Sequence, residues 1–195
     1  MRDSPTRSDY RLKMVAYPAG AIANWFLDKA ESAGRTLTPM QVLKLVYFAH
    51  GWHLAISDTE PLIEERVEAW KFGPVVPDLY REFRTFKAGG IVGRATMSIA
   101  SGDGNYEVVQ PSIPASRASG TSGYLAQLLE AMWDRYGHLD GLTMSQLTHR
   151  EGTPWDIVWN QKDGKSRLRS VIPDNLIAKH FRELLSDNLS ADSAS

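Results

Sequence analysis

His50 and His53 stand three positions apart in a segment of helical character, a spacing that places two imidazoles on neighbouring parts of a helix surface. Two such histidines could ligate one metal ion, and His138, His149 or His180 could complete the set. A tight third-ligand signature such as H-E-x-x-H is missing from the chain. We therefore expect ordinary helix-face or core histidines, with no bound metal and no other cofactor.

Other catalytic patterns are incomplete. Gly164-Lys165-Ser166 looks like the end of a phosphate-binding loop, but the upstream glycine of that motif would fall at Trp159 and no strand precedes it. No serine stands in a G-x-S-x-G turn, and the absence of cysteine excludes thiolate nucleophiles and thiolate metal sites. Carboxylate pairs such as Glu64 and Glu65 have no apolar surroundings to raise a pKa. The sequence predicts a protein that is not an enzyme.

One basic cluster comes late in the chain. It consists of Lys162, Lys165, Arg167 and Arg169, and Asp163 interrupts it. A phosphate-binding patch and a solvated loop are both compatible with this pattern. Because the formal net charge is −1, with 22 basic and 23 acidic residues, no overall field attracts the chain to nucleic acid or to an anionic membrane.

The length and composition favour one compact domain. The chain has 195 residues, of which 43% are hydrophobic and 23% are charged, so a sizeable core can form without disulfides. We expect a flexible N-terminal arm over 1–13, a single helical domain over 14–186 and a flexible C-terminal tail over 187–195. No export signal or membrane-spanning run is visible, so we expect a cytoplasmic protein.

The clearest predicted helix covers about 39–57 and lies at the centre of a mainly α fold. Thr38 is suited to cap its start, Pro39 to its first position, and Gln41 completes a capping box. A helix that is apolar on nearly all sides must be buried. Gln41, Lys44 and Gly51 share one edge of it, and the two histidines fall on another. Further helices are predicted over 18–33, 78–86, 124–136, 143–150, 153–159 and 174–185.

Three stretches have patterns that are not helical. Residues 68–77 hold two prolines and a glycine within five positions, which prevents a continuous helix or a central strand and indicates a structured loop. Residues 91–110 contain two extended runs around a Gly-rich turn, which predicts a small β-hairpin. Residues 111–123 are rich in Ser, Pro and Gly and predict a flexible connector.

Within the 68–77 loop, strand-like alternation over Trp70, Lys71 and Phe72 would bury both rings on one face and point Lys71 outward. On that interpretation the two aromatic residues anchor the core.

Three segments carry a resemblance to a known family. They are Val42-Leu43-Lys44-Leu45-Val46-Tyr47-Phe48-Ala49-His50-Gly51-Trp52-His53-Leu54-Ala55, then Glu68-Ala69-Trp70-Lys71-Phe72-Gly73-Pro74-Val75-Val76-Pro77, then Leu147-Thr148-His149 with Thr153-Pro154-Trp155. In this order and spacing the chain resembles the Panacea domain, also described as SocA-like or phage-associated GepA-like. The resemblance runs from about residue 18 to residue 181.

That resemblance implies an antitoxin of a toxin–antitoxin system, which neutralises a cognate protein toxin by direct contact. Toxins paired with the family include alarmone synthetase-like enzymes and other growth inhibitors. One member acts as an adaptor that delivers its toxin to a AAA+ protease, so adaptor activity is an alternative mechanism. The rest of the reading, with no catalytic constellation and near-neutral charge, is compatible with a binding protein.

The first candidate for the toxin-binding surface is the rigid 68–77 loop, since rigid aromatic and proline-bearing surfaces lose little entropy on binding. Its candidate residues are Trp70, Lys71, Phe72, Gly73, Pro74 and Pro77. A scaffold role for this loop is the alternative, with partner contacts made instead by the 91–110 hairpin or the 111–123 connector. A third hypothesis, a DNA-binding autoregulator that uses 143–159 as a helix-turn-helix, lacks a basic face.

Overall fold

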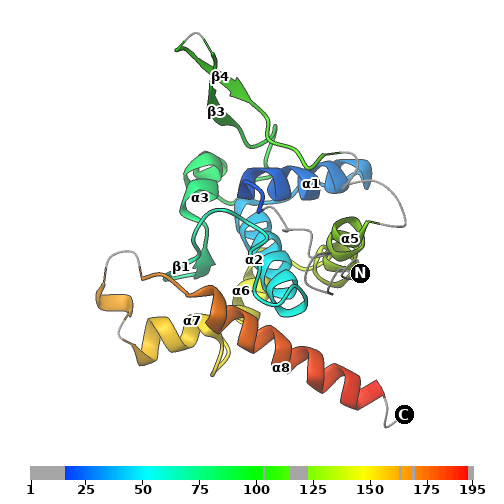
Figure 1. Cartoon of the computed structure of the whole chain (residues 1–195), viewed down its shortest axis with the longest axis vertical. Helices are drawn as coiled ribbons and strands as arrows, with labels where there is room; N and C mark the ends of the chain where they lie inside the picture. The colour runs from blue at the N-terminus through cyan, green and yellow to red at the C-terminus, as the bar shows by residue number, and fades with distance from the viewer. Residues whose placement is uncertain (1–15, 103, 115–122, 163, 168–169, 193–195) are drawn as a thin grey trace, which may run out of the picture.

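The fold is mainly α, as predicted, with two small two-stranded antiparallel sheets in the part of the chain that the structure describes. The computed structural model describes residues 16–102, 104–114, 123–162, 164–167 and 170–192. Around the central helix α2 (Pro39–Ile56) lie α1 (Ala19–Ser32), α5 (Tyr124–Tyr136), α6 (Gly141–Thr148) and α8 (Asp174–Asp192), as Figure 1 shows.

Helix α2 begins where the sequence predicts. The Thr38 hydroxyl accepts a hydrogen bond from the Gln41 backbone N–H, and the Gln41 side chain accepts one from the Thr38 N–H, which completes the capping box. Nearly every residue of α2 is buried, including the predicted polar ones. The apolar periphery of this helix therefore packs against neighbours on all sides.

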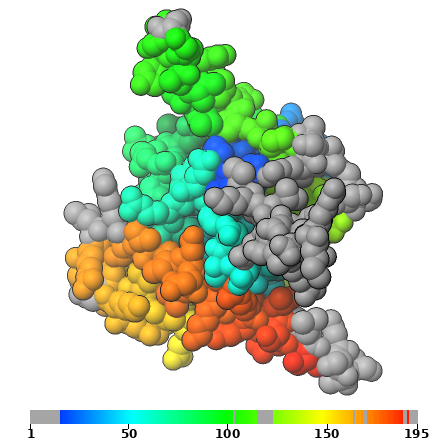
Figure 2. Space-filling model, in the orientation of Figure 1, coloured from blue at the N-terminus to red at the C-terminus, as the bar shows by residue number. Residues whose placement is uncertain are grey.

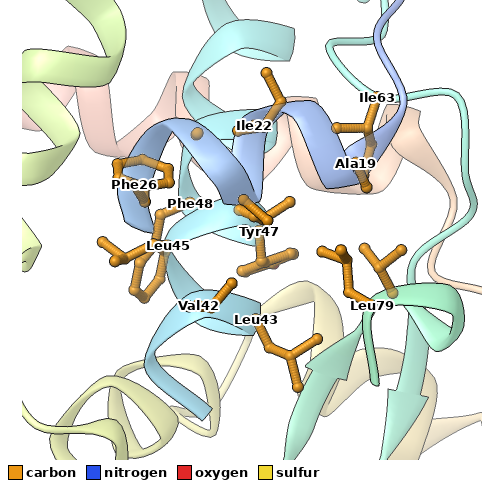
Figure 3. Packing of buried hydrophobic residues seen from close by; sticks show 14 of the residues in the cluster. Ala19, Ile22, Phe26, Val42, Leu43, Leu45, Tyr47, Phe48, Ile63 and Leu79 are labelled. Carbon is orange, nitrogen blue, oxygen red and sulfur yellow. The ribbon is translucent and has the colours of Figure 1, made fainter. Parts of the chain in front are cut away.

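The core lies between α2 and the elements that cover it. Ile22 and Phe26 of α1 belong to one buried cluster with Val42 and Leu45 of α2, and Leu79 of α3 (Pro77–Phe83) is part of the same cluster (Figure 3). Each of these side chains is less than 5% exposed. Burial of large apolar side chains at about 1.5–3 kcal/mol each is the main source of stability in such a core.

The 68–77 stretch is more regular than a loop. Strands β1 (Glu68–Trp70) and β2 (Gly73–Val75) pair antiparallel, with Trp70 opposite Gly73, so residues 71 and 72 form the turn of a hairpin. The proline in β2 is compatible with a strand because a two-stranded sheet has only edges. A central strand is absent here, as predicted, but a short hairpin replaces the expected irregular loop.

Two helix boundaries in the C-terminal third differ from the prediction: the start of α6 and the end of α8. The N-cap of α6 is Asp140, whose side chain accepts the Thr143 N–H, so the helix begins two residues before the predicted cap at Thr143. Helix α8 continues to Asp192, although we predicted an end at Leu185 and a tail from 187. Neither glycine nor proline interrupts 186–192, and the hydroxyls of Ser186 and Ser190 donate to carbonyls four residues back, which is compatible with helix.

Between α6 and α8 the chain forms three short helical elements in the described residues. Thr153 caps α7 (Pro154–Asp156) as predicted, with its hydroxyl accepting the Asp156 N–H, and a π-helical turn, η2 (Ile157–Gln161), follows. A 3-10 turn, η3 (Gly164–Ser166), contains the residues that resemble the end of a phosphate loop.

Earlier in the chain another 3-10 turn, η1 (Arg84–Phe86), directly follows α3 and extends it.

The predicted 91–110 hairpin is confirmed as β3 (Met97–Ala100) and β4 (Tyr106–Val109). Figure 1 shows it projecting from the helical body beside α1 and α3. Of the predicted connector, residues 115–122 lie outside the described residues, while Pro111 and Ile113 are buried. The first part of that connector is thus packed against the core.

The domain limits stay predictions, since the arm over 1–13 and the last three residues lie outside the described residues. No helix in the described ranges is long and apolar enough to cross a membrane.

Candidate functional site

The three sequence segments that carry the family resemblance meet around the turn of the β1–β2 hairpin. Lys44 comes from α2, Ser145 and His149 come from α6 and the residue after it, and Trp155 comes from α7. All four side chains make polar contacts with backbone carbonyls of residues 70–74. Residues far apart in the sequence therefore fix one short turn.

Lys44 lies beneath the hairpin. It is 1% exposed, and its Nζ atom donates to the carbonyl oxygens of Phe72 at 2.8 Å and Pro74 at 3.0 Å. Within the described part of the chain no carboxylate forms an ion pair with it. Desolvation by burial lowers the pKa of Lys44 to about 7. The amine keeps two N–H donors when neutral, so both carbonyls stay satisfied in either state.

The opposite side of the turn is held by α6 and α7. The Ser145 hydroxyl donates to the Phe72 carbonyl at 3.1 Å, and the indole N–H of Trp155 donates to the Trp70 carbonyl at 2.7 Å. His149 Nε2 lies 3.3 Å from the carbonyl oxygen of Lys71. Satisfied polar networks of this kind favour a single conformation.

Gly73 is the residue that lets the turn approach this network. Its φ of +103° lies in the region that side chains disfavour. A Cβ atom at this position would stand 2.6 Å from Lys44 Nζ and 2.7 Å from Thr148 Oγ1. Both the backbone conformation and the available space therefore require glycine.

The tip of the hairpin faces solvent. Phe72 is 61% exposed, and the Nζ atom of the exposed Lys71 lies 5.5 Å from the centre of its ring. The prediction that alternation would bury both Trp70 and Phe72 is wrong for Phe72, because the turn at 71–72 ends the strand pattern. Lys71 is exposed, as expected.

The other candidate residues are buried or half-buried and pack within the fold. Trp70 is half-buried, with its ring 4.9 Å from that of Tyr80 and its indole N–H donating to Glu68 Oε2 at 2.9 Å. Pro74 is buried in β2, and Pro77 is the first residue of α3. Of the six predicted residues, only Lys71 and Phe72 present an exposed surface at the tip.

A depression of about 650 Å³ adjoins the hairpin along α3. Trp70 and Tyr80 supply its aromatic wall, and charged side chains of both signs surround it. Its lining includes Glu64, Glu65, Arg66, Glu68, Asp78, Arg81 and Arg84. The β1–β2 hairpin thus carries the exposed Phe72 at its tip and adjoins a hollow lined by aromatic and charged side chains. Protein–protein interfaces are enriched in aromatic residues at their centre and have a polar rim.

The histidines considered as metal ligands are dispersed. His50 Nε2 lies 3.2 Å from Asp174 Oδ1, whereas both ring nitrogens of the buried His53 lack a hydrogen-bond partner in the structure described. Burial, with a smaller contribution from neighbouring His50, lowers the pKa of His53 to about 4. No group of three potential metal ligands occurs among the described residues.

The helix-turn-helix hypothesis gains no support from the geometry. Its second helix, predicted over 153–159, corresponds to α7 and the start of η2, where residues 154–156 and 158 are buried and Ile157 and Trp159 are half-buried. Lys162, Lys165 and Arg167 of the basic cluster are exposed, while Arg169 lies outside the described residues. A recognition helix must expose side chains toward bases, and none of residues 153–159 is exposed.

Comparisons with known proteins cover the same segments of the chain. Residues 42–156 match the family model described as "Antitoxin SocA-like, Panacea domain", and this range includes all three segments around the hairpin. The chain is 32% identical over 165 residues to a protein named Antitoxin SocA from Caulobacter vibrioides (strain NA1000 / CB15N), covering 84% of this chain and 82% of that relative. No solved structure matches the chain.

Proposed function

Because the chain belongs to the SocA-like antitoxin family that the Panacea domain defines, we propose that it neutralises a cognate toxin by binding it directly, without catalysis. An antitoxin role implies a toxin as partner. The binding surface we propose is the tip of the β1–β2 hairpin with the adjoining depression along α3.

One observation carries this proposal: an aromatic side chain that is 61% exposed, Phe72, stands on a turn whose carbonyls are held by buried side chains. Burial of Phe72 in a partner would remove apolar surface from contact with water, which favours binding. Because the turn is already ordered, little conformational entropy is lost when the partner binds. Aromatic residues are enriched at protein–protein interfaces, and a few buried anchors supply most of the binding energy there.

The absence of a catalytic role is part of the proposal. The polar side chains at the hairpin contact backbone carbonyls of residues 71 and 72; they are Lys44, Ser145 and His149. A nucleophile or base needs a free lone pair directed at a substrate. We therefore assign these groups to positioning the turn.

The test is co-expression with the toxin encoded by the neighbouring gene. We expect growth to be restored and the two proteins to elute together as one species in size-exclusion chromatography. Toxin that co-elutes but disappears in cells only when the antitoxin is present would identify delivery to a protease as the mechanism. Rescue without any complex would contradict direct binding.

A further inference from the structure

The β3–β4 hairpin stands apart from the body of the molecule. Figure 2 shows it as a protrusion at one end of the space-filling surface. Its large side chains are open to solvent: Tyr106 is 77% exposed, Val108 67% and Ile99 40%. A two-stranded hairpin with no support from other elements is only marginally stable in water.

The base of this hairpin, in contrast, is fixed to α1 by a buried side chain. The Asn24 amide nitrogen donates to the carbonyl oxygens of Ala95 at 3.1 Å and Pro111 at 2.9 Å, and its Oδ1 accepts the Ala95 N–H at 2.7 Å. Asn24 is 5% exposed. It therefore holds the residues that precede β3 and follow β4.

Two further contacts tighten the base. A Cβ at Gly20 would lie 3.0 Å from Pro111, so the chain packs closely on α1 there. The Arg94 guanidinium forms ion pairs with Asp28 and Glu31 of α1. A fixed base beneath an uncovered hairpin indicates that the hairpin is presented to something outside this chain.

The pairing pattern identifies which backbone groups are open. The Ser101 N–H donates to the Asn105 carbonyl at 2.8 Å, so this is a hydrogen-bonded pair. Such pairs alternate with non-bonded ones along an antiparallel ladder. In the observed register Tyr106 and Val108 belong to non-hydrogen-bonded pairs, with Ala100 and Ser98 as their partners. The backbone N–H groups of these four residues therefore point away from the other strand, toward the outer edge of their own strand.

The sequence of the hairpin lacks the usual protection of such edges. Proteins block exposed edges with lysine, proline or bulges. Residues 97–109 contain no basic residue and no proline. Of the two edges, β4 has the residues with the higher strand propensity, since tyrosine and valine occupy its outward positions, whereas serine and alanine occupy those of β3.

We propose that the outer edge of β4 binds an extended segment of the toxin, which adds a third strand to this sheet. This inference rests on the proposed function and assigns a second contact to the same complex. Strand addition supplies affinity through main-chain hydrogen bonds. Tyr106 and Val108 are two residues apart, so their side chains lie on one face of the sheet, where they would contact the side chains that the added segment places on that face.

A second copy of this chain is the less suitable occupant. Each edge is four residues long. Two such edges paired alone would bury far less than the roughly 1,200 Å² that a stable interface needs. A toxin that also contacts Phe72 would add the surface at the β1–β2 hairpin to the contact made at this edge.

Proline substitution separates the two edges. Val108→Pro removes an outward N–H on β4 and leaves the internal ladder intact, while Ala100→Pro makes the same change on β3 and is the matched control. By titration calorimetry with the purified toxin, we expect Val108→Pro to weaken binding at least tenfold and Ala100→Pro to bind within twofold of wild type. Equal affinities for Val108→Pro and wild type, or equal losses in both variants, would overturn the proposal.

Hydrogen exchange on the unmodified complex gives a second test that needs no variant. We expect the amides of Tyr106 and Val108 to become protected when the toxin binds, with no change at Ser98 and Ala100. Unprotected Tyr106 and Val108 amides in a formed complex would overturn strand addition but leave the proposed function standing. Wild-type protein that does not bind the toxin would overturn both, and a dimer of the free chain that Val108→Pro dissociates would assign the edge to a second copy instead.

Discussion

The Nζ atom of Lys44 lies 2.8 Å from the carbonyl oxygen of Phe72, so a buried amine on the central helix fixes the backbone beneath an exposed aromatic side chain. Lys44 holds the turn from below, and Phe72 projects from it into solvent. The presentation of Phe72 therefore depends on a residue that no partner can touch.

Lys44→Met tests this dependence. Methionine keeps the length and apolar stem but removes the Lys44 donor from two carbonyls. The Phe72 carbonyl keeps its hydrogen bond from Ser145, whereas the Pro74 carbonyl loses its side-chain donor, at a cost of about 1–3 kcal/mol for a buried unsatisfied group. We expect a fall in Tm of several degrees and a loss of toxin affinity of about tenfold, measured by thermal denaturation and calorimetry. Lys162→Met, at an exposed lysine, is the control and should change neither. Unchanged affinity in a folded Lys44→Met protein would contradict the positioning role.

The pH dependence of stability provides a second test of Lys44. Its pKa of about 7 in the fold lies below the ordinary lysine value of 10.5, so between these values the unfolded chain binds more protons than the folded one. Stability should therefore rise with pH from about 7 to 10.5, by at most about 1.4 kcal/mol per pH unit. Urea denaturation of wild type and Lys44→Met across this range should give curves that diverge. Parallel curves would show that Lys44 stays charged in the fold.

His53 should make the fold sensitive to acid. Burial holds its folded pKa at about 4, below the ordinary value of 6.5, so protons favour the unfolded state as the pH falls from 6.5 toward 4. His53→Leu fills similar space without an unpaired ring nitrogen. We expect wild type to lose stability relative to His53→Leu in that window, by up to about 1.4 kcal/mol per pH unit. A constant difference between the two proteins would refute this assignment.

Gly51 tests the contact between α2 and α8. A Cβ at this position would lie 2.2–2.6 Å from ring atoms of Phe181. Gly51→Ala should destabilise the protein by about 1–3 kcal/mol through overpacking, despite the better helix propensity of alanine. Gly102→Ala, where nothing lies within 4 Å, is the matched control for thermal denaturation. Equal Tm values for the two variants would mean that α8 moves away without cost.

Much of the helical framework is predictable because its signals are local. The Thr38 capping box and the apolar circumference of 39–57 define α2 without knowledge of its neighbours. The sequence also shows that Gln41, Lys44 and Gly51 share one edge of this helix, but it does not show why these residues stand in a buried helix. Gln41 donates to the Leu139 carbonyl, Lys44 holds the hairpin, and Gly51 makes room for Phe181. These partners are distant in sequence, so periodicity cannot identify them.

The candidate site was predictable in part for the same reason. Proline and glycine indicated a rigid segment at 68–77, and the structure has a hairpin there. The exposure of Phe72 depends on the turn at 71–72, whose position follows from the hydrogen bonds of Lys44, Ser145 and Trp155. Alternation alone therefore assigned Phe72 to the wrong side.

The central claim is that Phe72 at the fixed hairpin tip meets the toxin, and its most direct test is the toxin affinity of Phe72→Ala. Leu142→Ala is the matched control, because Leu142 is an exposed apolar residue of α6 at 66% exposure. Titration calorimetry should show at least a tenfold loss for Phe72→Ala, about 1.4 kcal/mol or more, and no loss for Leu142→Ala. Equal toxin affinities for Phe72→Ala and wild type would contradict the account.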